Sequence, residues 1–161
     1  MSKIRLQQPV IHIPSFLEYK ISGSELAKKY SDLGIDMPFV RSDSWYYHSD
    51  VEGWAKIMPD LVIKSNLYKR DRFDCEDYAL KAQVTCAERY GLNTLRYTYG
   101  KMPLGAHGFC SFWTGDGMML FEPNEGFKDE RGTEHDLWGY LDGDIVFPIA
   151  ANGYIPIAVL L

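Results

Sequence analysis

Phe73-Asp74-Cys75-Glu76-Asp77-Tyr78-Ala79 opens the strongest helix pattern in this chain. Asp74 is a good N-cap residue, and the acids that follow the cysteine put negative charge at the end of the helix where the macrodipole favours it. The helix can run to Tyr90, because Gly91 supplies a C-terminal stop. We therefore expect a helix over 74–90 with the cysteine in its first turn. One face of this helix carries small side chains, which favours close approach to a sheet or another helix. These residues are Cys75, Ala79, Ala82 and Cys86.

Strand-like segments follow this helix at 94–99, 106–113 and 118–122. Thr114-Gly115-Asp116-Gly117 separates the last two and is typical of a hairpin turn. Near the end of the chain, segments 144–148 and 154–160 flank Ala150-Ala151-Asn152-Gly153, which predicts a second hairpin. Pro148 and Pro156 favour edge positions for those strands.

Upstream of the cysteine the pattern is weaker. A short helix can run over 25–33 and end at Gly34, and Ser49 with Glu52 forms a capping-box pattern before a helix over 50–58. Pro59 would end that turn or open the next. A helix followed by antiparallel strands predicts an α+β domain.

Length and composition indicate how the chain is divided into domains. The 161 residues, with 46% hydrophobic and 24% charged, predict one globular domain over 1–161. We divide it into a wrap of irregular and helical structure over 1–60, a core over 68–126 that holds the cysteine helix and the hairpin, and a C-terminal hairpin over 140–161.

Charge and hydropathy exclude several function classes. The net charge of −5, with no strong basic block, argues against a nucleic-acid partner. No apolar run is long enough to predict a membrane span, and the first ten residues lack the apolar stretch of a secretory signal. We expect a cytoplasmic protein.

The cysteines point to free thiols. There are three, Cys75, Cys86 and Cys110, and an odd number argues against a disulfide framework. The first two are eleven positions apart on one helix, about 16 Å, which is too far to bridge. Neither a metal nor a cofactor is predicted. No CxxC pair exists, and Cys110 has the opposite strand parity to His107, which disfavours a metal site built from these two residues and Cys75.

Thiol catalysis needs a cysteine that is partly thiolate, a histidine within reach and a group that orients the histidine. A helix N-terminus lowers the pKa of a thiol, so Cys75 fits the first requirement. Asp74, Glu76 and Asp77 oppose it, because carboxylates disfavour a thiolate nearby. A close histidine would have to supply much of the stabilisation. A buried structural cysteine is the alternative.

Four histidines are available, and the hairpin distinguishes them. His12 lies in an apolar run, His48 in an aromatic cluster and His135 in a polar loop, whereas His107 begins a strand. If the turn over 114–117 closes the hairpin, paired positions sum to 231 and Glu122 falls opposite Phe109. Glu122 then shares a face with His107 as a diagonal neighbour, about 7–8 Å away along the backbone. The sequence permits a His107–Glu122 pair.

The cysteine segment resembles the nucleophile motif of the transglutaminase-like, papain-related cysteine peptidase superfamily. It is most similar to the bacterial transglutaminase-like cysteine proteinase branch and to related proteins of phages and prophages. Three later features come in the same order as in that branch. They are a glycine after the helix, here Gly91, then a strand with histidine, Gly105-Ala106-His107-Gly108, and then an acid before proline, Leu120-Phe121-Glu122-Pro123-Asn124. The resemblance covers roughly Tyr68 to Gly126.

The resemblance implies a papain/transglutaminase-like core, in which a nucleophile-bearing helix packs on an antiparallel sheet. It implies Cys75 as nucleophile, His107 as base and Glu122 as the orienting acid, where aspartate is commoner in the superfamily. A phage origin would place the protein in the host cytoplasm or the virion. Papain-like enzymes often place a glutamine upstream as oxyanion donor. Here the polar candidates are Asn66, Lys69 and Arg70, or backbone N–H groups at Cys75.

Two function classes remain open. The first is a cysteine hydrolase or acyltransferase that acts on an amide or peptide bond of a peptide or protein substrate. The second is a catalytically inactive binding or structural module, whose ligand groove would use the aromatic groups Trp45-Tyr46-Tyr47 and Phe109, Phe112 and Trp113. Core packing is the alternative role for those rings.

Overall fold

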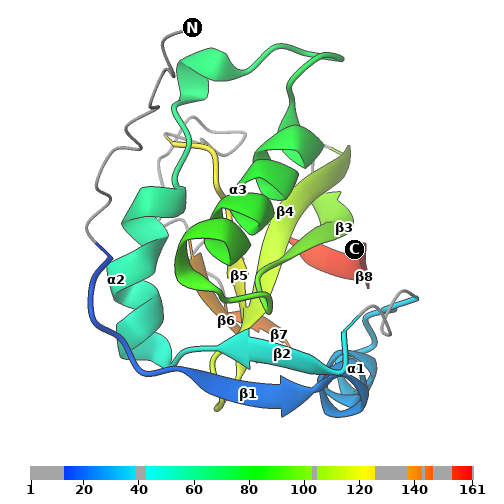
Figure 1. The fold of residues 1–161 in the computed structure, drawn as a ribbon. Helices are drawn as coiled ribbons and strands as arrows, with labels where there is room; N and C mark the ends of the chain where they lie inside the picture. The colour runs from blue at the N-terminus through cyan, green and yellow to red at the C-terminus, as the bar shows by residue number, and fades with distance from the viewer. Residues whose placement is uncertain are drawn as a thin grey trace, which may run out of the picture.

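Helix α3 (Cys75–Tyr90) lies across one face of a six-stranded antiparallel sheet in the computed structural model (Figure 1). The structure describes residues 13–38, 43–102, 105–125, 138–142, 144–146 and 154–160. The helix begins and ends as the sequence predicts, with Asp74 as N-cap and Gly91 as a left-handed C-cap at φ 70°.

The large sheet has the order β7-β6-β5-β4-β3-β8, and every pair of neighbours in it is antiparallel. Its strands are β3 (Arg96–Met102), β4 (Gly105–Trp113), β5 (Met118–Phe121), β6 (Trp138–Asp142), β7 (Asp144–Val146) and β8 (Ile155–Val159). Strand β3 starts two residues later than expected and runs three residues further.

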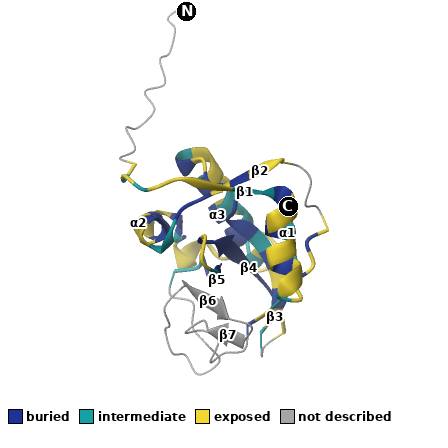
Figure 2. Cartoon of the chain, turned by 90° about the horizontal axis from the view of Figure 1, so that it is seen from below, coloured by how far each residue is buried: buried dark blue, intermediate teal, exposed yellow. Residues whose placement is uncertain are grey.

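The main core lies between α3, the sheet and α2 (Val51–Leu61). The small stripe of α3 packs there, since Ala79, Ala82 and Cys86 are buried with Phe112 of β4 and Trp54 of α2. The Trp54 and Phe112 rings have centroids 4.7 Å apart. Figure 2 shows this burial as the dark central strands, with helices buried on their inner sides only. The small residues let α3 approach the sheet closely, as the sequence predicts.

The second face of the sheet is covered by α1 (Gly23–Asp32). It starts two residues before the expected helix, because Ser22 and Glu25 form a capping box. Two strands that the sequence did not predict, β1 (Tyr19–Ser22) and β2 (Trp45–His48), form a separate antiparallel pair. The expectation of an irregular and helical wrap over 1–60 is corrected in this respect. Residues 1–12 and 39–42 lie outside the described residues.

Helix α2 differs from the expected one at both ends. Asp50 caps it by accepting from the Gly53 N–H at 2.8 Å, so the Ser49–Glu52 capping box is wrong. Ser49 instead donates its hydroxyl to the Leu17 carbonyl at 2.6 Å. Pro59 lies inside the last turn, and the helix continues to Leu61. A short 3₁₀ turn, η1 (Ser65–Leu67), then leads toward α3.

The hairpin register is confirmed. Trp113 pairs with Met118, Cys110 pairs with Phe121, and the Thr114 N–H donates to the Gly117 carbonyl at 3.1 Å. Positions across the hairpin therefore sum to 231. Since the pairing with β5 ends at Cys110, residues 105–109 of β4 pair, among the described strands, with β3 alone.

The C-terminal hairpin expected over 140–161 is wrong. Strand β7 pairs with β6, whereas β8 pairs with β3 at the opposite edge of the sheet. The turn residues between them lie outside the described residues. Strand β6, with which β7 pairs, was not predicted from the sequence. Pro156 does occupy an edge strand, as its missing N–H favours.

These elements make a mixed fold of helices and antiparallel sheets, compatible with the α+β class. Within the described segments, no helix has the length and apolar character needed to cross a membrane.

Truncation of the core aromatic ring tests this packing. We expect Phe112→Ala to lower the free energy of unfolding by about 3–5 kcal/mol, because a fully buried ring leaves a cavity. Urea denaturation measures the change. Val84→Ala on the exposed side of α3 is the control, and its effect should stay within about 0.5 kcal/mol. Equal effects of the two substitutions would contradict the packing.

Candidate active site

The first turn of α3 meets strand β4 at Gly108. A Cβ atom at this position would lie 3.1 Å from the Glu76 backbone nitrogen and Cα and 2.9 Å from the Tyr97 ring. Any side chain here would push the helix away from the strand. Gly108 thus permits the close contact between the first turn of α3, which carries Cys75, and the strand that carries His107.

His107 and Glu122 form the pair that the hairpin register allows. The His107 Nε2 atom lies 2.6 Å from a Glu122 carboxylate oxygen, Oε2, and both side chains are buried. Glu122 is only 1% exposed, so its carboxylate depends on protein donors rather than on water. A carboxylate and an imidazole at this distance form a short, charge-assisted hydrogen bond.

Two further groups hold the Glu122 carboxylate. The Tyr154 hydroxyl donates to Oε2 at 3.1 Å, and the Asn124 backbone N–H donates to Oε1 at 3.1 Å. Tyr154 comes just before β8 and is fully buried. Burial is the main reason that the pKa of its phenol lies far above the usual range, followed by the Glu122 charge. Tyr154 therefore stays protonated and acts as a donor.

Aromatic rings enclose His107. Its ring centroid lies 5.4 Å from Tyr154 in an edge-on arrangement and 6.0 Å from Phe109 in a stacked one. Phe109 and Tyr154 also pack edge to face at 5.1 Å. This apolar surround restricts the rotation of the imidazole, so the Nε2–Glu122 hydrogen bond fixes the orientation of the ring.

Cys75 is the second hydrogen-bonding neighbour of His107. Burial lowers the pKa of the imidazole, but hydrogen bonds with the Cys75 and Glu122 side chains and their charges outweigh it and raise the pKa to about 9. Because Nε2 is taken by Glu122, Nδ1 is the ring nitrogen left for the sulfur. The three residues that the sequence singled out are thus brought together, in the order thiol, imidazole, carboxylate.

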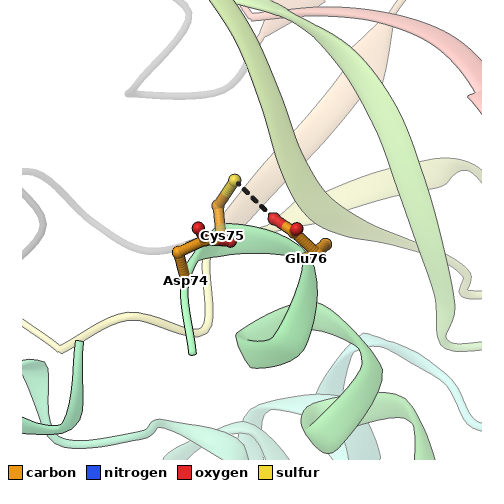
Figure 3. Close-up of side chains that lie close together, drawn as sticks. All are labelled: Asp74, Cys75 and Glu76. Atoms are coloured by element: carbon orange, nitrogen blue, oxygen red, sulfur yellow. Dashed lines mark hydrogen bonds between the residues drawn. The ribbon is translucent and has the colours of Figure 1, made fainter. Parts of the chain in front are cut away.

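The carboxylates beside Cys75 act against a thiolate. The Cys75 thiol donates to a Glu76 carboxylate oxygen, Oε2, at 3.4 Å (Figure 3). The neighbouring Glu76 side chain is the main reason that the pKa of Asp74 is lowered, ahead of hydrogen bonds from the backbone N–H groups of Asp71 and Cys75. The sulfur has one proton, so it can donate to Glu76 or, as a thiolate, accept from His107.

The other two cysteines are structural. Cys86 and Cys110 are fully buried, and burial raises the pKa of both thiols, that of Cys110 well above its usual range. All three cysteines are free. Cys110 donates to the Ala79 carbonyl at 3.5 Å, on the face of the sheet away from His107, as its strand parity predicts. A metal site of Cys75, His107 and Cys110 is thereby excluded.

The oxyanion donor expected from the sequence is not provided by a side chain. Asn66, Lys69 and Arg70 are exposed, and none of them forms a hydrogen bond with Cys75 among the described residues. The Cys75 backbone N–H is directed at the Asp74 carboxylate. A substrate oxygen would have to displace that carboxylate to use this donor.

The remaining predicted positions divide between core and surface. Phe109, Phe112 and Trp113 are buried, as is Tyr46, so these rings pack in cores and the aromatic ligand groove is wrong. Only Trp45 and Tyr47 of that set are exposed. His48 is buried and stacks on Tyr19 at 5.6 Å. His12 and His135 lie outside the described residues.

Sequence reasoning missed Tyr154, Asn124 and Gly108. Tyr154 reaches the site only because β8 crosses to the β3 edge, and no local pattern predicts that pairing. Gly108 lies in the segment that carries the resemblance, directly after His107. A glycine at this position could have indicated that another backbone segment packs closely against the strand.

No protein-family model, curated protein or solved structure matches this chain. The site therefore stands on its own geometry.

Alkylation by iodoacetamide at neutral pH tests this geometry. We expect Cys75 to react fastest of the three thiols, since the other two are buried and have raised pKa values. His107→Ala should slow it about tenfold or more, because the reactive thiolate loses the imidazolium that stabilises it. Peptide mass spectrometry assigns the modified residue.

Glu76→Gln should act in the opposite direction and speed alkylation about 2- to 10-fold, because it removes a carboxylate that accepts the thiol proton. Glu88→Gln, exposed near the other end of α3, is the matched control and should leave the rate unchanged. Equal rates at all three cysteines, or no effect of His107→Ala, would rule out the arrangement.

Proposed function

We propose that this protein is a cysteine hydrolase or acyltransferase of the transglutaminase-like type, which acts on an amide or peptide bond through an acyl-thioenzyme. The observation that carries the proposal is the buried 2.6 Å hydrogen bond between His107 and Glu122, on a ring whose other neighbour is Cys75. A nucleophile at a helix N-terminus, a base and an orienting acid are the parts that this chemistry needs.

The chemistry would run as follows. The Cys75 thiolate attacks the carbonyl carbon, and a C–S bond forms while the carbonyl oxygen takes the charge. The His107 imidazolium gives its proton to the departing amine as the C–N bond breaks, which leaves an acyl-thioenzyme. Water then attacks the acyl carbon and loses a proton to His107, and the thiolate leaves. An amine in place of water would give a transferase.

Each supporting residue has a role in these steps. Glu122 stabilises the imidazolium and keeps Nδ1 directed at the sulfur, and its own charge is held by Tyr154 and Asn124. The raised pKa of His107, about 9, means that the imidazole carries its proton at neutral pH. It is therefore ready to act as the acid for the leaving amine.

The fold supports the same proposal. A cysteine helix against an antiparallel sheet, with histidine and acid on adjacent strands or just beyond them, is the arrangement expected of a papain/transglutaminase-like core. We propose such a core here, and a peptide or protein as substrate. A cytoplasmic location, in a bacterium or in the host or virion of a phage, remains part of this proposal.

A second candidate function rests on the Cys75–Glu76 contact. If the thiol keeps its proton on the carboxylate, the site has the residues of the superfamily without its reactivity, and the protein would be a binding or structural module. The Asp74 carboxylate at the Cys75 N–H favours this candidate as well, because it accepts from the donor that a substrate oxyanion would need.

Turnover of an acyl donor separates the two candidates. We expect release of ammonia or amine from glutamine-containing peptides, with loss of activity to background in Cys75→Ala. Glu122→Gln should lower kcat/KM by about 10²-fold or more, because the imidazole loses its charged partner. Glu88→Gln serves again as the neutral control. Retention of activity in Cys75→Ala would refute the acyl-thioenzyme. Absence of turnover across peptide and glutamine donors, with Cys75 unreactive, would favour the binding module.

A further inference from the structure

Arg96 is a largely buried cation for which the described residues provide no acceptor. It begins strand β3, on the sheet face covered by α1, and only 7% of its surface is exposed. Its Nε atom is enclosed and makes no hydrogen bond, and within the described residues no carboxylate lies within ion-pair distance of its guanidinium. Buried arginines are almost always paired, because an unpaired charge costs several kcal/mol away from water.

The hydroxyl groups on the same face of the sheet bond to one another. Ser111 lies opposite Arg96 across the strand pair, and its hydroxyl bonds Tyr30 at 2.8 Å and Thr98 at 2.6 Å. Thr98 in turn donates to the Arg96 carbonyl at 3.2 Å. The hydroxyl protons therefore run in one direction, from Tyr30 through Ser111 and Thr98 to the backbone. None of these oxygens accepts from the guanidinium.

The aromatic contact of Arg96 leaves its donors open. The guanidinium carbon lies 5.4 Å from the centre of the Tyr46 ring. A ring attracts the cation through its face, but it offers no acceptor to the N–H groups that lie in the guanidinium plane. A guanidinium that keeps its N–H groups free can bind planar carboxylates and phosphates through two parallel hydrogen bonds.

Arg89 shows what a satisfied arginine looks like in the same chain. Its Nη1 atom lies 2.6 Å from the Asp60 carboxylate, although it is much more exposed than Arg96. The chain thus provides a carboxylate for an arginine near the surface and none, among its described residues, for the buried one. The difference points to an acceptor that comes from outside the chain.

We propose that Arg96 binds a small oxyanion, a carboxylate or a phosphate, at the place where α1, β2 and β3 meet. The part of Arg96 that stays exposed is the side from which the ligand enters, and Tyr46 supports the guanidinium from one face. The site is separate from the cysteine chemistry, because it uses neither Cys75 nor His107. Its test accordingly does not depend on the proposed function.

Anion-dependent stability tests this site. Thermal unfolding is followed at pH 7 while inorganic phosphate or acetate replaces chloride at constant ionic strength. We expect a saturable rise in Tm of the wild-type protein with at least one of the two anions, because a ligand bound to the folded state stabilises it. A response to phosphate alone would identify a phosphate site, and a response to acetate a carboxylate site.

Arginine substitutions test whether the anion-dependent rise in Tm requires Arg96. Arg96→Met should abolish the rise, and Arg96→Lys, which keeps the charge without the planar fork, should weaken the apparent affinity about tenfold or more. Arg89→Met is the matched control and should respond as the wild type does. If Arg96→Met does not fold, the response of Arg96→Lys to the anion is the deciding measurement. No saturable response of the wild type to either anion, or an unchanged response in the Arg96 variants, would overturn the proposal.

Discussion

The buried hydrogen bond between His107 and Glu122 is the interaction on which the candidate site depends. A carboxylate that is 1% exposed can keep its charge only if protein donors replace water, and an imidazole, a tyrosine hydroxyl and a backbone N–H do so here. The same hydrogen bond fixes which ring nitrogen remains for Cys75. Removal of Glu122 would therefore alter both the charge and the orientation of His107.

Close backbone approach makes this interaction available to the thiol. Gly108 admits the first turn of α3 to β4, and Gly100 does the same for β8, since a Cβ there would collide with the Ile155 carbonyl and the Phe109 ring. Gly100 also lies at the point where the register between β3 and β8 shifts. These two glycines set the helix on one side of His107 and Tyr154 on the other. The arrangement of the candidate site thus follows from how closely the backbone elements can pack.

Local patterns predicted the parts of the fold that depend on nearby residues. Asp74 and Gly91 bound α3, and the turn after Trp113 set the register that pairs His107 with Glu122, because strand parity alone determines which residues share a face. The pairing of the C-terminal strand could not be predicted in this way. Strand β8 pairs with β3, more than fifty residues earlier in the sequence, so neither its partner nor the position of Tyr154 could be predicted from the adjacent sequence. The predicted cap of α2 was wrong for another reason, because the Ser49 hydroxyl donates to the carbonyl of Leu17, which is distant in the sequence.

The most direct measurement is the pKa of His107, followed by NMR of its ring protons. The account predicts titration near 9, well above the usual 6.5, and a lower value in Glu122→Gln and in Cys75→Ala. Because the folded-state pKa lies above the unfolded one, the ionised ring stabilises the fold fully below about pH 6.5, and that stabilisation is lost as the pH rises toward 9. A His107 that titrates at or below 6.5 in the wild-type protein would contradict the account.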